Sequence, residues 1–526
     1  MGTTIEKIKS VLWAGADTFR GVIDAANYKE YILTMLFIKY LDDTYEENVD
    51  ELRKKYPNDL RFERAKERLS FQLEDNTRFR HLYDNRFNTK IGVLINEALQ
   101  KIEDLNGELR GIFRSIDFNS EAVFGNTQQK NTRLRTLLED FVDLDLKPSH
   151  IEIKPGQTAA DVIGDAYEYM IGEFASRAGQ KAGAFFTPTM VSELMGHLVE
   201  PQKNNTIYDP TCGSASLLIR AAEQLDDLDH VGIYGQEVNG STYAMARMNL
   251  FIHNIHGADI RWGDSLANPL HLDSDGNLKQ FDVIVANMPF SLDKWAEGFN
   301  PGGESDGRQD VKKGKKFKME PSLDRFHRFE IGVPPASKGD WAFLLHMLAS
   351  LNNYGRMAAV VPHGVLFRGA SEGRIRQAVI ERNLLDTVIG LPPNLFYGTS
   401  IPACILVFKK NRTTDDILFI DASGQDENGN LRYEKDKNQN KLGSQHVTDI
   451  VDAYRNRRDV PRFSHVAPLS EIQENEYNLN IPRYVDTFEP EELINIDEVQ
   501  ANIARIKNEL AEVEEQMEGF LKKLGL

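Results

Sequence analysis

Apolar strand-like runs alternate with helix-like stretches between residues 205 and 408, and this alternation limits the possible folds more than any other feature of the chain. The runs predict strands at Asn205–Tyr208, Val231–Gln236, Ile260–Trp262, Phe281–Ala286, Arg356–Val361, Leu385–Gly390 and Ala403–Phe408. Helices are predicted between them at Ser214–Gln224, Thr242–His253, Asp340–Leu351 and Glu372–Arg382. This order is typical of a doubly wound α/β sheet. Because crossovers between parallel strands are right-handed, the loops that follow these strands should gather at one edge of the sheet.

Acidic residues stand at the ends of the first three predicted strands. Asp209 closes the first strand, Glu237 the second, and Asp264 follows the third. Small residues around Gly213 let a ligand approach the backbone where a helix begins. The chain has neither a P-loop lysine nor a G-x-G-x-x-G motif, which disfavours cofactors that contain a pyrophosphate. A cationic nucleoside such as S-adenosylmethionine fits three carboxylates better.

The fourth strand ends in a short polar and aromatic sequence, Asn287-Met288-Pro289-Phe290. The asparagine side chain offers both a hydrogen-bond acceptor and a donor at the edge where α/β sheets bind ligands. The proline stiffens the turn, and an exposed Phe290 would offer a flat surface. Together they suit a planar amine such as a nucleobase, although the same pattern also occurs in ordinary turns.

A long insertion rich in glycine and proline, residues 291–339, follows this turn and carries the densest positive run of the chain. The run is a candidate for contacts with DNA phosphates and contains Lys312, Lys313, Lys315, Lys316 and Lys318. A solvated loop is the alternative. The net charge of −18 argues against the whole chain being a simple phosphate-neutralising DNA binder. A nucleic-acid substrate would therefore need a local basic surface or a basic partner.

The two ends of the chain differ from its centre. Residues 1–155 have helical spacing and predict a separate helical domain, followed by a catalytic domain over residues 156–470. The final segment, 471–526, ends in a heptad seam formed by Val499, Ile503, Ile506, Leu510, Val513, Met517, Phe520 and Leu524. A helix with one narrow apolar stripe must pack against another helix. We expect a partner subunit there, with the N-terminal helices as the alternative.

Composition is that of a globular protein of about three domains, with 41% hydrophobic and 27% charged residues. Cys212 and Cys404 form no disulfide framework, which indicates a reducing compartment. No signal peptide and no membrane span are expected, because the apolar stretch Tyr31–Leu41 is short and contains Lys39. The sequence therefore predicts a cytoplasmic protein, and it predicts no metal-ligand set.

Four motifs carry a resemblance to a known family: Ala184-Phe-Phe-Thr-Pro188, Asp209-Pro-Thr-Cys-Gly-Ser214, Gly235-Gln-Glu-Val-Asn239 and Asn287-Met-Pro-Phe290. They occur in the order found in amino-methylating DNA methyltransferases. Further segments resemble the modification (M) subunit of type I restriction-modification systems: Asp340–His346, Gly355–Gly364, Arg374–Gln377, Leu391–Thr399 and Tyr477–Tyr484. With the helical N-terminal region and the closing heptad helix, the resemblance covers nearly the full length.

The resemblance implies a doubly wound S-adenosylmethionine-dependent methyltransferase sheet between an N-terminal helical domain and a C-terminal coiled-coil helix. It implies methylation of the exocyclic N6 amine of adenine in duplex DNA. A separate specificity (S) subunit would choose the DNA site, with two M subunits for each S subunit. A restriction (R) subunit is left open as a further partner.

The family's roles carry over onto matching positions. The implied cofactor-binding residues are Ala184, Phe185, Phe186, Thr187, Pro188, Asp209, Thr211, Gly213, Ser214, Ser216, Glu237 and Asp264. Among them, Glu237 would bind the ribose and Asp264 would lie near the adenine ring. Residues 287–290 would hold the target base, with Phe290 and Phe396 stacking on or beside it. Thr187 is also expected to cap the helix Thr189–Val199, which Pro188 would open.

Two positions depart from the family pattern. Met288 replaces the usual first proline, and Ser216 replaces a frequent glycine. We expect retained activity, because the proposed acceptor at position 288 is a backbone carbonyl that any residue supplies. Four alternatives stay open: methylation of the cytosine amine, methylation of a protein glutamine amide, a non-catalytic cofactor-binding scaffold, and a methylase that recognises its own target site.

Overall fold

The computed structural model describes residues 2–20, 25–178, 186–225, 230–299, 319–396, 401–426, 428–436, 439–486 and 496–525. The chain forms two compact units, Met1–Val485 and Asp486–Leu526. The predicted cofactor residues Ala184 and Phe185 and the predicted DNA-contacting lysines at positions 312, 313, 315, 316 and 318 lie outside the described residues.

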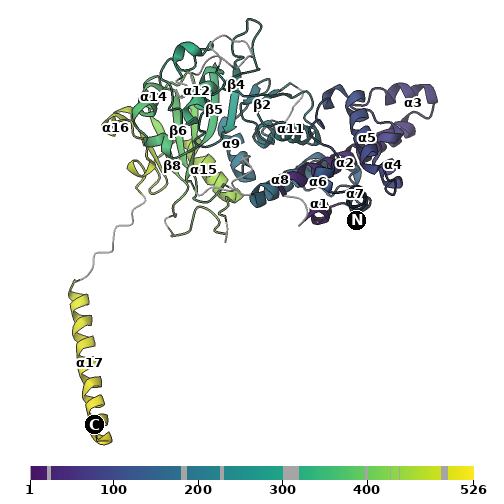
Figure 1. Ribbon diagram of the computed structural model, residues 1–526. Helices are drawn as coiled ribbons and strands as arrows, with labels where there is room; N and C mark the ends of the chain where they lie inside the picture. Colours follow the sequence, from purple (N-terminus) through teal and green to yellow (C-terminus); the bar gives the residue numbers. More distant parts are fainter. Residues whose placement is uncertain are drawn as a thin grey trace, which may run out of the picture. The chain divides into compact units, whose positions relative to one another are not determined.

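A nine-stranded sheet forms the centre of the first unit (Figure 1). Its strands are β1 (Thr206–Asp209), β2 (Gly232–Glu237), β3 (Asp259–Trp262), β4 (Phe281–Asn287), β5 (Leu351–Pro362), β6 (Leu385–Gly390), β7 (Ala403–Lys409), β8 (Ile417–Asp421) and β9 (Ser464–Ala467). They lie in the order β3-β2-β1-β4-β5-β7-β6-β8-β9. The β7 strand runs antiparallel to β5 and β6, and β9 runs antiparallel to β8. All seven predicted strands are present, and β8 and β9 are additional.

Helices cover both faces of the sheet, which confirms the doubly wound prediction. Along β4 the buried side chains alternate between two cores, as the two-residue repeat of a strand requires. Ile284 and Ala286 join the core under α12 (Asp340–Ala349) and α14 (Ala370–Glu381). Val283 and Val285 join the opposite core, which contains residues of α9 (Thr189–Val199), α10 (Ser216–Ala222), α11 (Gly240–Ile252) and α15 (Ser444–Asn456). Short helices α13 (Gly364–Phe367) and α16 (Leu469–Glu474) complete this part of the chain.

The N-terminal region is helical, as predicted. Its helices are α1 (Ile5–Phe19), α2 (Ala25–Lys55), α3 (Asp59–Lys66), α4 (Phe79–Asp84), α5 (Ile91–Leu105), α6 (Glu121–Phe124) and α7 (Thr127–Phe141). The next helix, α8 (Ala159–Ala178), lies beyond the predicted boundary at residue 155 but shares their core. Their apolar core also contains Met245, Met248 and Phe251 of α11, so α11 lies between the helical region and the sheet. Across the described residues, no helix is long and apolar enough to cross a membrane.

The first unit extends to Val485 and includes part of the segment that the sequence analysis grouped with the C-terminal helix. Leu479, Ile481 and Tyr484 are buried there, and the Tyr484 ring stacks on Phe419 of β8 with 3.9 Å between centroids. These contacts explain why residues 471–485 pack with the sheet.

The second unit contains one long helix, α17 (Ile496–Leu524), drawn in yellow in Figure 1. The eight residues of its predicted heptad seam are all exposed, from 43% for Val499 to 74% for Leu524. A stripe of exposed large apolar side chains on one helix is typical of a surface that binds another helix.

Candidate active site

The carboxyl ends of β2, β1 and β4 lie side by side in the sheet. Asp209 at the end of β1 pairs in register with Gly235 of β2, and Tyr208 pairs with Ile284 of β4. Because these strands are parallel, the polar residues that end them meet at one edge, as the sequence predicted. Glu237 ends β2, Asp209 ends β1 and Asn287 ends β4.

Asp209 is a buried carboxyl with one unused oxygen. Its side chain belongs to a residue only 1% exposed, and Oδ1 accepts a hydrogen bond from the Thr211 N–H at 2.8 Å. Oδ2 is buried and has no hydrogen-bond partner within the described parts of the chain. Burial, together with the negative charge of Glu237, raises the pKa of Asp209 to about 8. A cationic ligand beside Oδ2 would lower the cost of ionising this group, so the site fits a sulfonium cofactor.

Glu237 joins the loops that follow β1 and β2. Its Oε2 accepts a hydrogen bond from the Gly213 N–H at 3.0 Å, and its Oε1 accepts one from the Asn239 N–H at 2.8 Å. Gly213 has a φ of +54°, a conformation that favours glycine. Burial raises the pKa of Glu237, although these two backbone donors act against the shift.

Helix α10 begins two residues later than predicted, at Ser216 instead of Ser214. Ala215 has a φ of +67°, so the backbone before Ser216 cannot continue the helix. The Ser214 and Ser216 hydroxyls lie 3.0 Å apart, and Asn249 Nδ2 donates to the Ser214 carbonyl at 2.9 Å. Ser216 therefore replaces the family's glycine in a place that holds a small polar side chain.

Asp264 accepts hydrogen bonds from the N–H groups of Leu266 and Ala267, at 2.8 and 3.1 Å, and so orders the loop after β3. Beside this loop the structure adds two residues that the sequence analysis missed. Val238 and Trp262 are 65% and 54% exposed, and the Trp262 Nε1–H donates to the Val238 carbonyl at 2.9 Å. They offer an apolar surface for a flat ring next to the acidic strand ends. The available signal was their position, directly after Glu237 and at the end of β3.

The Asn287 amide is held in one orientation. Its Nδ2 donates a hydrogen bond to Thr187 Oγ1 at 2.9 Å, and both residues are buried, at 8% and 7% exposed. Oδ1 is buried and has no hydrogen-bond partner among the residues described. The prediction that Thr187 caps α9 is wrong, because Pro188 is the N-cap residue and no side chain caps this helix. The Thr187 hydroxyl instead leaves the amide oxygen of Asn287 free to accept an N–H.

The residues after Asn287 are less open than the sequence suggested. Met288 is fully buried in the core that contains α12, and Phe290 is half-buried instead of exposed. Phe396 is 5% exposed and meets the Phe290 ring at 74°, with 5.9 Å between centroids. Phe396 thus supports Phe290 edge-on, which is a favourable arrangement of two aromatic rings.

Asp340, at the start of α12, fixes the turn that follows Phe290. It is fully buried, and its Oδ1 accepts a hydrogen bond from the Ser291 N–H at 2.7 Å. Its Oδ2 pairs with Arg368 at 2.9 Å. Ser291 has a φ of +53°, so this bond stabilises a backbone conformation that a serine seldom adopts. In the sequence, Asp340 is recognisable only as part of the segment Asp340–His346, and its neighbours in the chain give no sign of this role.

Phe186 packs against α8. A Cβ atom at Gly172 of α8 would lie 2.9 Å from its ring, and the residue is 9% exposed within the N-terminal core. Its contact with the cofactor stays a prediction. Pro188, also predicted to bind the cofactor, is half-buried at the start of α9.

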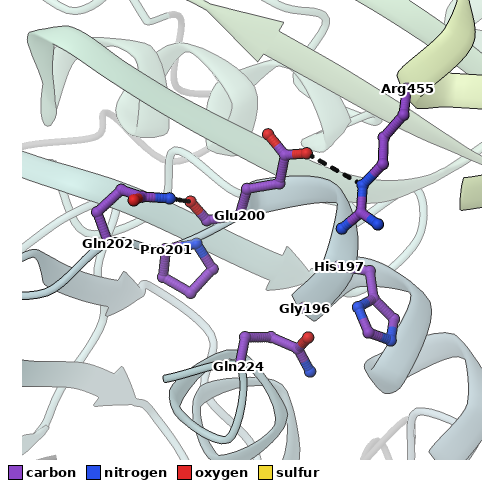
Figure 2. Close-up of a pocket in the computed structure, with 7 residues that line it drawn as sticks. All are labelled: Gly196, His197, Glu200, Pro201, Gln202, Gln224 and Arg455. Atoms are coloured by element: carbon purple, nitrogen blue, oxygen red, sulfur yellow. Dashed lines mark hydrogen bonds and ion pairs between the residues drawn. The ribbon is translucent and has the colours of Figure 1, made fainter. Parts of the chain in front are cut away.

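A cavity of about 400 Å³ lies at the opposite edge of the sheet (Figure 2). It is lined by Gly196, His197, Glu200, Pro201, Gln202, Gln224 and Arg455. Glu200 pairs with Arg356 near the beginning of the parallel part of β5, at 2.6 Å. None of the lining residues belongs to the predicted site, so this cavity is separate from the cluster around Asn287.

Two family descriptions match the chain. Residues 158–493 match N-6 DNA Methylase, and residues 8–141 match the HsdM N-terminal domain. The first match covers the sheet and the helices that flank it, including every described residue of the candidate site.

Whole-length relatives are similar to the chain. It is 29% identical to the type I restriction enzyme MpnII methylase subunit of Mycoplasma pneumoniae, over 98% of this chain and 96% of that protein. It is 30% identical to the type I restriction enzyme MjaVIII methylase subunit of Methanocaldococcus jannaschii, over 99% and 85%. A crystal structure of a type I restriction-modification methyltransferase subunit from Streptococcus thermophilus is 35% identical, with a TM-score of 0.77 over 92% of this chain and 100% of that chain.

Proposed function

Since the chain belongs to the N-6 DNA methylase family, we infer that it is an adenine-specific DNA methyltransferase, the modification subunit of a type I restriction-modification complex. It transfers a methyl group from S-adenosylmethionine to the N6 amine of adenine in DNA. The observation that carries the mechanism is the free, buried Oδ1 of Asn287, held in place by the bond from Nδ2 to Thr187.

Residues at the strand ends would hold the cofactor. When bound, S-adenosylmethionine supplies an electrophilic methyl group on a positively charged sulfur. Once ionised, Asp209 would place the negative charge of its unpartnered Oδ2 beside that cation, and Glu237 and the Gly213 backbone would form the adjoining wall. Val238 and Trp262 offer their exposed apolar surfaces to the adenine ring, close to Asp264.

Asn287 and Met288 would make the target amine more nucleophilic. The lone pair of the adenine amine is delocalised into the ring, which makes the amine a poor nucleophile. Hydrogen bonds from its two N–H groups to Asn287 Oδ1 and to the Met288 carbonyl would draw these groups out of the ring plane. A backbone carbonyl does not depend on the side chain at position 288, so the methionine is compatible with activity.

Phe290 would compensate for removing the base from the duplex. Flipping a nucleotide costs a few kcal/mol, and stacking on one aromatic ring returns about 1–3 kcal/mol. The two energies are comparable, so stacking decides whether the flipped state is populated. Phe396 meets Phe290 edge-on and leaves the orientation of that ring defined.

The exposed seam of α17 would bind a specificity subunit, and we propose two copies of this chain for each specificity subunit. Eight exposed apolar side chains spaced as a heptad seam support a helical partner. The net charge of −18 supports the proposal that a partner subunit makes many of the contacts to DNA. We also propose that residues 1–155 and 156–470 serve as helical and catalytic segments, and that within 471–526 the helix α17 serves in association.

Product analysis tests this function. The chain reconstituted with its specificity subunit should incorporate labelled methyl groups into duplex DNA, and the nucleosides should contain N6-methyladenine. N4-methylcytosine as the product would identify the cytosine amine as the target. Cofactor binding without transfer would identify a scaffold, and site-specific methylation by the chain alone would contradict the need for a specificity partner.

A further inference from the structure

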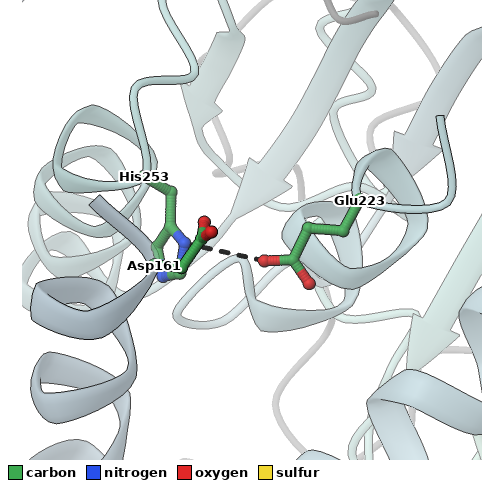
Figure 3. A group of neighbouring side chains, drawn as sticks. All are labelled: Asp161, Glu223 and His253. Carbon is green, nitrogen blue, oxygen red and sulfur yellow. Dashed lines mark ion pairs between the residues drawn. The ribbon is translucent and has the colours of Figure 1, made fainter. Parts of the chain in front are cut away.

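Three potential metal ligands meet outside the candidate active site (Figure 3). They are Asp161 in the first turn of α8, Glu223 directly after α10 and His253 directly after α11. One ligand atom from each lies within 4.8 Å of the other two. The three residues come from separate parts of the sequence, and the fold alone brings them together.

His253 is buried without hydrogen bonds. It is 6% exposed, and neither ring nitrogen has a hydrogen-bond partner in the described structure. Nδ1 points towards Glu223 Oε1 at 3.7 Å, too long for a hydrogen bond. On the other side the ring lies against Gly164 of α8, where a Cβ atom would overlap it. A buried imidazole with two unused nitrogens is costly unless something binds it.

Negative charge exceeds positive charge around this imidazole. Arg220 of α10 pairs with Asp165 at 2.6 Å, with Glu168 at 3.0 Å and with Glu223 at 2.8 Å. Asp161 is a fourth carboxylate, whose Oδ2 accepts a hydrogen bond from the Thr158 N–H at 2.7 Å. One guanidinium therefore pairs with three carboxyl groups, and Asp161 is a fourth beside the ring, which is an environment that favours a cation.

We propose that Asp161, Glu223 and His253 bind a divalent transition-metal ion, Zn²⁺. Imidazole nitrogen disfavours Mg²⁺ and Ca²⁺, whereas one nitrogen and two carboxylates suit Zn²⁺ with water in a fourth position. Zn–N and Zn–O bonds are about 2.0–2.2 Å, so the three ligand atoms must approach one another on binding. Asp161 is half-buried and Glu223 is exposed, so both carboxylates can be reached by an ion from solvent.

An ion can reach the site and would join three helices. Asp161 and His253 line a cavity of about 480 Å³, which Tyr40, Thr44 and His256 also border. Helices α10 and α11 begin beside the loops of Gly213 and Glu237 and end at this cluster. A bound ion would therefore fasten α8 to the far ends of the two helices that start at the cofactor site. This proposal does not depend on methyl transfer.

The test is Zn²⁺ binding by the metal-stripped full-length chain, measured by calorimetry. We expect one ion per chain and a rise in melting temperature on adding Zn²⁺. His253→Ala should weaken binding at least tenfold and abolish the rise. His465→Ala is the matched control, because His465 also lies between two carboxylates but each of its nitrogens has its own partner, Asp459 at 3.3 Å and Glu471 at 2.9 Å.

Two results would overturn the proposal: no Zn²⁺ binding by the wild-type chain, or equal binding by wild type and His253→Ala. If circular dichroism shows that His253→Ala is unfolded, Glu223→Gln decides, because Glu223 lies at the surface and the amide keeps its shape. A tenfold weaker Zn²⁺ affinity in Glu223→Gln would support the site, and an unchanged affinity would refute it.

Discussion

The hydrogen bond from Asn287 Nδ2 to Thr187 Oγ1 allows a quantitative test of how the amide that we propose as catalytic is positioned. Thr187→Val removes the acceptor oxygen and keeps the size and branching of the side chain. In the variant the Asn287 Nδ2 loses its acceptor at a site where the residue is only 8% exposed. A buried donor left without its partner costs about 1–3 kcal/mol. Rotation of the amide would relieve this cost but would turn Oδ1 away from the target amine.

If the free energy of the unpaired Asn287 donor raises the transition state, methyl transfer slows by about 5- to 150-fold, at 1.36 kcal/mol for each factor of ten. The assay is single-turnover transfer of labelled methyl groups to duplex DNA by the complex with its specificity subunit. Thr187→Ser is the matched control, because it keeps the hydroxyl and should restore most of the rate. In this prediction Thr187 would act as a positioning residue.

Cofactor affinity separates this role from a direct contact between Thr187 and the cofactor. The positioning role predicts that Thr187→Val binds S-adenosylmethionine with nearly wild-type affinity and loses rate in the transfer step. A transfer rate within threefold of wild type would show that Thr187 does not position the Asn287 amide. A loss confined to cofactor affinity would instead assign Thr187 to the cofactor pocket.

Three further predictions follow from the site and from α17. Burial raises the pKa of Asp209 to about 8, so the group is largely protonated at pH 7. Affinity for the cationic cofactor should therefore rise as pH increases from 7 to 9. Calorimetry should find this rise in wild type and not in Asp209→Asn. Phe290→Ala should lose about 1–3 kcal/mol of stacking energy and slow methylation of paired adenine by about 5- to 150-fold. The loss of rate should be smaller on DNA whose target adenine is mismatched. An equal loss of rate on both substrates would contradict a stacking role. The double variant Ile506→Asp with Leu510→Asp should no longer associate with the specificity subunit in size-exclusion chromatography. Its melting temperature should be unchanged, because both side chains are already 55% exposed. The double variant Glu509→Lys with Glu512→Lys is the surface-charge control and should still associate.

Much of the sheet could be predicted from the sequence, because a buried strand requires an apolar run, and such a run can be recognised in the sequence. The run Phe281–Ala286 is such a case, and β4 spans Phe281–Asn287. The β8 strand also has this signal in Ile417-Leu-Phe-Ile420 and was predictable. The β9 strand has only four residues, with Ser464 and His465 among them, and it forms because β8 offers an edge on which to pair. Its local signal is weak.

Contacts between distant residues could not be predicted in this way. A threonine before a proline and a helix is a good candidate cap by local rules, but Thr187 bonds to Asn287, 100 positions away. Asp340, which fixes Ser291, and the cluster of Asp161, Glu223 and His253 have no diagnostic spacing in the chain. The periodicity of apolar residues indicates which face of a helix or strand is buried. Which polar side chains come into contact is determined by the fold.

The role of Asn287 in methyl transfer can be tested with the Asn287→Ala variant. The variant complex should be assayed for N6-methyladenine in duplex DNA by mass spectrometry and for S-adenosylmethionine affinity by calorimetry. We expect loss of methyl transfer with cofactor affinity close to wild type, because Asp209 and Glu237 are untouched. Methyl transfer at the wild-type rate would contradict the assignment of Asn287 as the residue that holds the target amine.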